Sequence, residues 1–180
     1  MKKFLLSASL IIIAICIIAI TQIIPKSYSV TLEGVKYQLG ADHKAFTSPV
    51  TIRIDGELKK SLTNVKTFNG IIDVEGENIP VPSDQRKLEI KFQENGAGPI
   101  VYSYNDNGSP VTYSYGTLYV NTDFSEVTIA TSAKDAADAS KGSWTAEDGY
   151  MITAPAGDRE EALKLSNELM KDFLNGKTLE

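Results

Sequence analysis

The first section of the hydrophobic pattern is a long apolar run near the N-terminus. Residues 4–24 carry no charge, and these 21 residues are enough for a helix to cross a bilayer core of about 30 Å. Lys2 and Lys3 precede the run, and basic residues tend to remain in the cytoplasm. The pattern predicts that residues 1–26 form a cytoplasmic tip and a single-pass membrane anchor, with residues 27–180 outside the cell membrane.

Two alternatives to an uncleaved anchor remain open. A signal peptide usually has an apolar core of about 7–15 residues and a small-x-small cleavage site. Ser27 and Ser29 provide a weak site of this kind, and cleavage there would make the protein secreted. Cys16 raises the alternative of a lipoprotein, but Ile15 precedes it rather than a small residue. The length of the run favours the uncleaved anchor.

The second section alternates apolar and polar residues with a period of two, as half-buried β-strands do. In residues 49–55, for example, Val50, Ile52 and Ile54 share one side. The predicted strands cover residues 28–39, 49–55, 60–67, 70–76, 86–93, 99–105, 111–121, 126–132, 142–147 and 150–154.

Asn-Gly and Asp-Gly pairs separate several of these segments. Both residue types tolerate the positive φ angles of tight hairpin turns. The Ala-rich residues 133–143 read as a loop or one short helix. We expect turns at residues 55–56, 69–70, 95–96, 107–108 and 148–149.

The third section has a helical period and spans residues 158–175. Asp158 stands where an N-cap is expected, with Glu161 three residues later as in a capping box. We expect this amphipathic helix to cover one face or one open end of the β-structure. The predicted apolar stripe consists of Ala162, Leu165, Leu169 and Phe173, widened by Met170 and Leu174.

Composition indicates one exported domain without disulfides. Residues 27–180 number 154, about the size of one domain, and the chain's only cysteine lies before them. Three of the 18 basic residues and none of the 23 acidic ones lie in residues 1–26, which leaves a net charge of −8. This acidity argues against a nucleic-acid partner and against a domain that lies flat on anionic lipid.

The sequence offers little that names a reaction, and we expect no cofactor, no metal site and no catalytic residues. His43 is the only histidine, so a site with several histidine ligands is excluded. Asp73, Glu75 and Glu77 alternate along one predicted strand and would share a face. That face is most simply a solvated one, but the acids would also suit Ca²⁺ or a hydrolase with a pair of carboxylates.

The tyrosines form the most suggestive group. Tyr102 and Tyr104 share one strand face, and Tyr113 and Tyr115 share a face of the next strand across the predicted turn at 107–108. If these strands pair, the four rings form a cross-strand aromatic patch. Such a patch binds sugars or extended peptides when it is exposed, and it belongs to the core when it faces inward. The apolar neighbours Ile100 and Val111 favour the core side.

Several segments taken together resemble a known class of protein. They are residues 50–56 and 58–62, residues 68–70, residues 116–119, and residues 144–156 leading into 160–163. These segments resemble uncharacterised membrane-anchored extracytoplasmic domains of Gram-positive bacteria, a type also attached to antirepressor-type membrane metallopeptidase sensors. The resemblance implies a location and a sensing or interaction role, and it transfers no catalytic residue.

We therefore expect an α+β, mainly β fold: an antiparallel sandwich or barrel-like domain with one C-terminal amphipathic helix, after an N-terminal transmembrane helix. The expected function is a non-enzymatic binding or interaction module with a cell-wall or membrane-protein partner. The alternatives are an exported hydrolase that uses a carboxylate pair and an accessory subunit of a membrane sensor complex. The predicted ligand-binding residues are Tyr102, Tyr104, Tyr113 and Tyr115.

Overall fold

The computed structural model describes residues 24–61, 63–135 and 138–180. The predicted anchor at residues 4–24 lies almost wholly outside this part of the chain. Within the described ranges, no helix is both long enough and apolar enough to cross a membrane.

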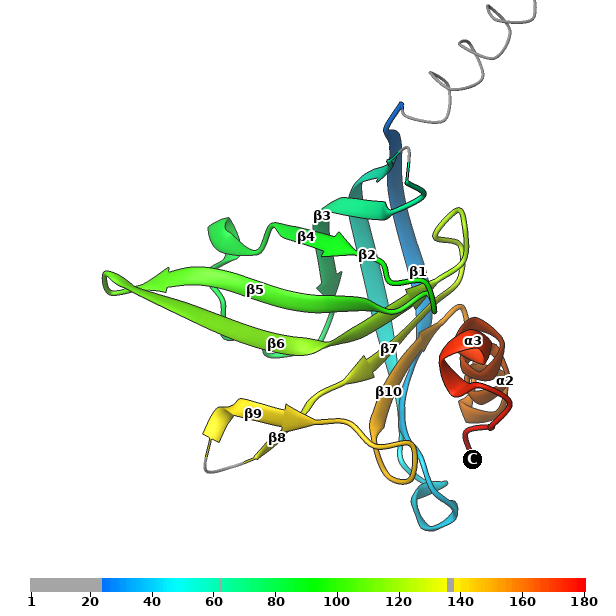
Figure 1. Cartoon of the computed structure of the whole chain (residues 1–180). Helices are drawn as coiled ribbons and strands as arrows, with labels where there is room; N and C mark the ends of the chain where they lie inside the picture. Colours follow the sequence, from blue (N-terminus) through cyan, green and yellow to red (C-terminus); the bar gives the residue numbers. More distant parts are fainter. Residues whose placement is uncertain (1–23, 62, 136–137) are drawn as a thin grey trace, which may run out of the picture.

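The centre of the molecule is one antiparallel sheet of eight strands, with the order β4-β3-β2-β1-β10-β7-β6-β5. The sheet curls until its two edge strands, β4 and β5, come together, which gives a nearly closed barrel (Figure 1). This confirms the predicted mainly β, antiparallel class, and of the two expected architectures, a sandwich or a barrel-like domain, the structure has the barrel-like one. The strands are β1 Lys26–Gln38, β2 Thr47–Lys60, β3 Lys66–Val74, β4 Leu88–Lys91, β5 Gly98–Asp106, β6 Ser109–Val120, β7 Val127–Thr131 and β10 Tyr150–Ala154.

Smaller elements complete the described chain. Strands β8 (Ala133–Asp135) and β9 (Asp138–Ser143) form a separate two-stranded sheet, so the prediction of a loop or a short helix for residues 133–143 is wrong. Short 3₁₀ turns occur at η1 (Ala41–His43) and η2 (Ser83–Gln85). Helices α2 (Arg159–Leu169) and α3 (Lys171–Leu174) end the fold.

Two of the predicted turns are strand interiors. Gly56 lies within β2 and Gly70 within β3, directly opposite each other. A Cβ atom on Gly56 would lie 2.7 Å from the ring of Phe68, and one on Gly70 would lie equally close to it. The two glycines therefore make room for the Phe68 ring, a known way in which an aromatic side chain covers glycine in a sheet. The predicted strands 49–55 and 70–76 therefore belong to two longer strands, β2 and β3, whereas the predicted strand 60–67 runs from the last residue of β2 to the start of β3 and is wrong.

The turn at residues 107–108 is confirmed. Asn107 has φ 51° and Gly108 has φ 89°, and the two residues join β5 to β6. Positive φ at both central residues is the geometry of the tight hairpin turn that Asn-Gly favours.

The inward-facing side chains of the strands fill the barrel. Ile52, Phe68, Ile90 and Ile129 have almost no exposed surface there. A second apolar cluster lies on the outer face of the barrel beneath the helices. Its buried members are Val35, Tyr37, Leu39, Ala97, Tyr119, Ala130, Met151, Ala162, Met170, Leu174 and Leu179.

The C-terminal helix covers one outer face of the barrel, as expected, and packs on β1, β7 and β10 (Figure 1). Asp158 is its N-cap, since its carboxylate accepts a hydrogen bond of 2.9 Å from the Glu161 backbone N–H. The helical segment is divided at Met170 into α2 and α3.

The predicted apolar stripe of the helix is confirmed in part: Ala162, Met170 and Leu174 are buried, and Leu169 packs against the same cluster. The residues of the helix that are buried are Ala162, Ser166, Met170 and Leu174, at intervals of four, whereas Phe173 is 41% exposed. The buried face of the helix therefore includes a polar residue, Ser166. A serine can be buried at this position because its hydroxyl group contacts other hydroxyl groups beneath the helix.

Candidate ligand-binding cavity at one end of the barrel

A cavity of about 400 Å³ opens at the end of the barrel where β3 stops and β10 begins. Lys36 contributes to it from β1, ten residues beyond Lys26, and ten strand residues span roughly 30 Å. The cavity therefore lies at the end of β1 remote from the predicted anchor. Its lining residues are Lys36, Gly76, Glu77, Asn78, Tyr113, Tyr115, Thr131, Ser132 and Tyr150.

A β-bulge directs Tyr115 toward this cavity. In the β5–β6 ladder, Ile100 lies opposite Gly116 and Val101 lies opposite Ser114, so Tyr115 is the extra residue. The carbonyl of Tyr115 accepts a 2.9 Å hydrogen bond from the backbone N–H of Ser132. Bulges of this kind redirect a side chain and are common near functional sites.

The hydroxyl group of Tyr115 is buried without a hydrogen-bond partner in the described part of the chain. The whole residue is only 5% exposed. Burial raises the pKa of this phenol well above its usual value, and the nearby negative charge of Glu77 raises it further. At neutral pH, Tyr115 is thus a neutral group that can donate and accept a hydrogen bond, rather than a nucleophilic phenolate.

An ion pair and an aromatic ring form the adjoining wall. The Lys36 ammonium lies 2.6 Å from a Glu77 carboxylate oxygen, and both side chains are mostly shielded from solvent. The same ammonium lies 5.7 Å from the centre of the Tyr150 ring, within the range of a cation–π contact. Phe46 packs edge-on against Tyr150 at 5.4 Å between ring centres. The cavity therefore combines a fixed charge pair, aromatic rings and an unpaired hydroxyl.

The four predicted tyrosines separate into two groups. All lie on the inward side: Tyr102, Tyr113 and Tyr115 are buried, and Tyr104 is half-buried against the core. Tyr102 stacks on Tyr113 with ring centres 6.3 Å apart, and its hydroxyl donates to the Ile72 carbonyl at 3.4 Å. Tyr113 and Tyr115 line the cavity, whereas Tyr102 and Tyr104 do not.

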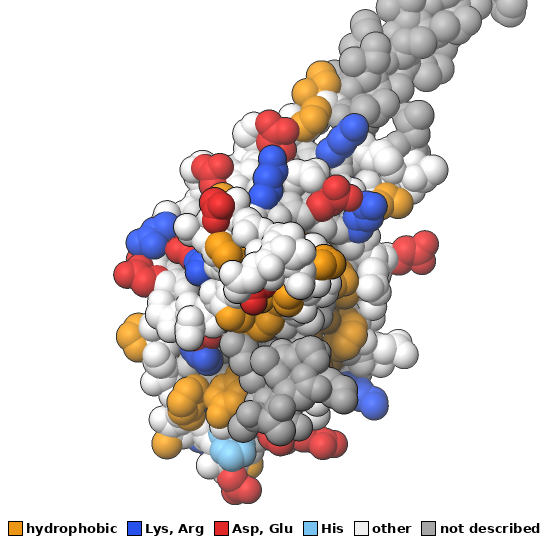
Figure 2. All heavy atoms as spheres, turned by 90° about the vertical axis from the view of Figure 1, so that its left-hand side faces the viewer, with side chains coloured by type: hydrophobic (Ala, Val, Ile, Leu, Met, Phe, Trp, Pro, Cys, Tyr) orange, Lys and Arg blue, Asp and Glu red, His pale blue; other side chains and the backbone are white. Residues whose placement is uncertain are grey.

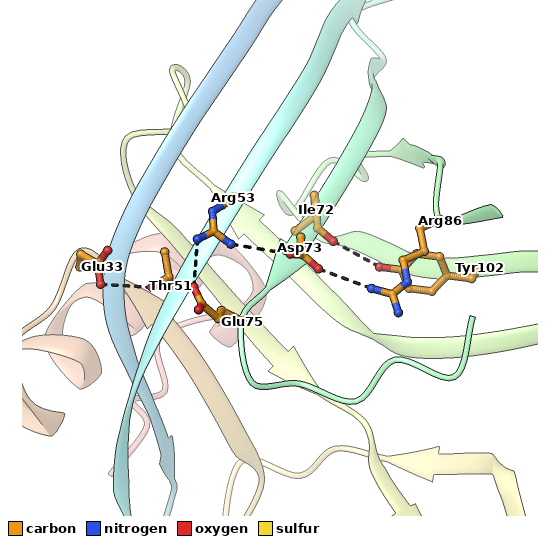
Figure 3. Close-up of polar contacts among 8 residues, drawn as sticks. All are labelled: Glu33, Thr51, Arg53, Ile72, Asp73, Glu75, Arg86 and Tyr102. Atoms are coloured by element: carbon orange, nitrogen blue, oxygen red, sulfur yellow. Dashed lines mark hydrogen bonds and ion pairs between the residues drawn. The ribbon is translucent and has the colours of Figure 1, made fainter. Parts of the chain in front are cut away.

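Of the three acidic residues that were grouped by sequence, Asp73 and Glu75 both pair with Arg53 (Figure 3). The Arg53 guanidinium lies 3.0 Å from Glu75 and 4.0 Å from Asp73, and Arg86 lies 3.6 Å from Asp73 on its other side. Glu77 instead lies beyond the end of β3 and pairs with Lys36. The expectation that all three acids share one strand face is wrong, because β3 ends at Val74.

The other candidate ligands are dispersed. His43 lies in the 3₁₀ turn η1, with no ion pair to any described residue. Over residues 24–61, 63–135 and 138–180, no three His, Cys, Asp or Glu side chains come close enough to hold a metal ion.

Sequence reasoning did not assign Lys36 or Tyr150 to a binding site. Lys36 looks like any polar residue of a half-buried strand, and Tyr150 looks like any aromatic residue that begins a predicted strand. Comparison of the chain with protein-family models, curated proteins and solved structures gave no match in any of the three.

Proposed function

We propose that this protein is a membrane-anchored, extracytoplasmic binding module without catalytic activity, and that the cavity at the barrel end holds a glycan fragment of the cell wall. Residues 4–24 provide the anchor in this proposal. The resemblance to anchored extracytoplasmic domains of Gram-positive bacteria agrees with the same location.

The observation that carries the proposal is the buried hydroxyl of Tyr115 with no partner among the described residues. A buried polar group without a hydrogen bond is costly, and native proteins rarely contain one without a reason. A ligand hydroxyl in the cavity would supply the missing bond. The fold holds Tyr115 there by a bulge, so the side chain is directed toward the cavity.

The chemistry of the wall favours a sugar over a purely apolar ligand. Sugar rings present both C–H faces and hydroxyl groups, and the cavity offers the aromatic ring of Tyr150 beside donors and acceptors on Lys36 and Glu77. Ligand sites commonly combine aromatic walls with a few placed polar groups, and the mouths of β-barrels are frequent locations for them.

The hydrolase alternative needs two carboxylates that face one cleft. Asp73 and Glu75 flank the guanidinium of Arg53 on an exposed face (Figure 3), and of the cavity's described lining residues Glu77 alone is acidic. The sensor-subunit alternative needs a free apolar helix face, but Ala162, Met170 and Leu174 are already buried against the barrel. No observation favours either alternative over the binding module.

The test is co-sedimentation of the full chain, held in detergent micelles, with isolated bacterial cell wall. We expect the parent protein to bind and Tyr115→Phe to bind about 3- to 10-fold more weakly, the loss expected for one neutral hydrogen bond. Phenylalanine keeps the ring and its packing, so the change isolates the hydroxyl.

Tyr119→Phe is the matched control. It also removes a hydroxyl from a buried tyrosine, but Tyr119 packs on the outer face of the barrel beneath the helices. Its binding should equal that of the parent. Failure of the parent to bind the wall, or equal binding by the Tyr115→Phe protein, would overturn the glycan proposal.

A further inference from the structure

A second cavity, of about 530 Å³, lies at the opposite end of the barrel, where β1 begins beside the β2–β3 connection (Figure 1). Three lysines line it, Lys26, Lys60 and Lys66, and none of its described lining residues is acidic. None of the three lysines forms an ion pair with a described residue. We name them the mouth lysines.

The strand register places the mouth lysines on the inner face of the barrel. Lys26 lies opposite Leu58, whose side chain packs against the core, and Lys60 lies directly opposite Lys66. Like charges directly opposite each other across two strands destabilise a sheet. An anion held between them would remove that repulsion.

The domain as a whole carries a net negative charge, whereas the mouth lysines form a cluster of positive charge. Acidic side chains also lie near this end of the molecule on the face shown in Figure 2. Glu57 and Glu89 alternate with inward-facing residues of β2 and β4 and so point outward. Glu94 and Asp172 line an adjoining cavity, which Lys66 lines as well, whereas Lys26 and Lys60 line only the second of these two cavities. The outward direction of Glu57 and Glu89 separates those two carboxylates from the mouth lysines.

Apolar groups surround the same opening. Ile24 lines the cavity and is 56% exposed, and Val65, in the β2–β3 connection, is 43% exposed. Ile24 is also the last residue of the uncharged run at 4–24. Two residues of extended chain span at most about 7 Å, so an anchor that ends at Ile24 places Lys26 at the level of the lipid headgroups.

We propose that the mouth lysines bind the phosphate group of an anionic membrane phospholipid and thereby fix the orientation of the barrel on the bilayer. This proposal rests on the membrane attachment within the proposed function, and it is independent of the glycan cavity at the other end. Basic residues close to an anchor are attracted to anionic lipid, while the acidic remainder of the domain is repelled from it. The barrel would therefore stand on this end rather than lie flat.

The test measures the accessibility of lysines in the full-length chain in lipid nanodiscs. One set of discs contains only phosphatidylcholine, and the other also contains anionic phosphatidylglycerol. Acetylation rates of individual lysines are followed by mass spectrometry. We expect the mouth lysines to react several-fold more slowly in the anionic discs, and Lys87 and Lys164, which are exposed elsewhere, to react equally in both.

The protection should disappear in about 1 M salt, where the Debye length is about 3 Å. The protection should also require all three mouth lysines. In the double variant Lys60→Gln/Lys66→Gln, we therefore expect Lys26 to be acetylated as fast in anionic discs as in neutral ones. The control Lys87→Gln/Lys164→Gln changes the net charge equally and should retain the protection.

Equal rates in the two kinds of disc would overturn the proposal. Protection by inorganic phosphate in neutral discs would also overturn it, because the site would then bind free phosphate instead of lipid. A chain that does not enter discs would overturn the membrane attachment and this proposal together. An inserted chain with unprotected mouth lysines would overturn this proposal alone.

Discussion

Four hydroxyl groups without exposed surface meet between α2 and the barrel. Ser166 lies 2.7 Å from the Tyr37 hydroxyl, 2.8 Å from that of Thr128 and 2.7 Å from that of Thr153. The two threonine hydroxyls are 2.6 Å apart. Four hydroxyl protons are enough for these four contacts, so the cluster can be fully satisfied without water. A buried polar group stabilises only when it is paired in this way.

Replacement of Ser166 by alanine should therefore destabilise the protein although alanine suits a helix better. The change removes the common partner of Tyr37, Thr128 and Thr153, and leaving buried hydroxyls unpaired costs about 1–3 kcal/mol. The free energy of unfolding in urea measures the effect. Lys164→Ala, an exposed change on the same helix, is the control and should change stability little. Equal stability of the two variants would show that the hydroxyl cluster does not stabilise the docking of the helix.

At the scale of the element, the β2–β3 pair depends on two glycines. The backbone of β2 approaches β3 so closely at this point that a Cβ atom on Gly70 would lie 2.6 Å from the Gly56 Cα atom. Phe68 fills the space above both residues and is completely buried. Asp55-Gly56 and Asn69-Gly70 are dipeptides of a kind that usually marks a turn. The close approach of the two backbones allows β2 and β3 to continue through them.

Gly70→Ala should destabilise the β2–β3 pair, because the new methyl group would collide with backbone atoms and with the Phe68 ring. Overpacking of this kind costs about 1–3 kcal/mol. Gly157→Ala is the matched control, because a Cβ atom at this position would lie near a single atom of the described residues, its chain neighbours aside. That atom is a carboxylate oxygen of Glu161, at 3.3 Å, on a flexible side chain. Urea unfolding compares the two variants. A Gly70→Ala protein as stable as the control would mean that the strands can separate without cost.

At the scale of the whole molecule, burial keeps several tyrosine hydroxyl groups protonated at pH values where an exposed tyrosine would lose its proton. Burial raises the pKa of Tyr102 to about 12, with opposing contributions from Arg86 and Asp73, and burial also raises the pKa of Tyr119 to about 12. An unfolded tyrosine titrates near pH 10. Between these pH values, the unfolded chain loses protons that the folded chain keeps, so the unfolded state gains stability as the pH rises.

We therefore expect the free energy of unfolding to be insensitive to these tyrosines below about pH 10 and to fall as the pH rises from about 10 to about 12. Urea unfolding at a series of alkaline pH values measures this. Tyr119→Phe removes one of the titrating groups and should show a shallower fall than the parent. An identical pH dependence in the two proteins would mean that Tyr119 does not keep its proton in the folded state.

Properties carried by neighbouring residues were accessible from the sequence. The alternation in β2, the Asn107-Gly108 hairpin and the Asp158 N-cap each depend on a few consecutive residues, and all three are present in the structure. The mainly β, barrel-like class with a C-terminal helix follows from such local patterns taken together. The inward direction of the tyrosines was favoured for the same reason, since their apolar neighbours lie on the same side.

The tertiary structure alone decided which distant residues meet. Strict alternation in β6 would place Tyr119 on the same side as Tyr113, but the bulge at Tyr115 shifts the phase, so Tyr119 packs under the helix. The Lys36–Glu77 pair joins residues 41 positions apart. Ser166 is buried because its hydroxyl group contacts three hydroxyl groups, one each from β1, β7 and β10. The spacing of apolar residues in the sequence indicates which side of a strand or helix is buried only where no bulge interrupts the alternation. Bulges, close glycine contacts and long-range pairs are set by the packing of the whole barrel.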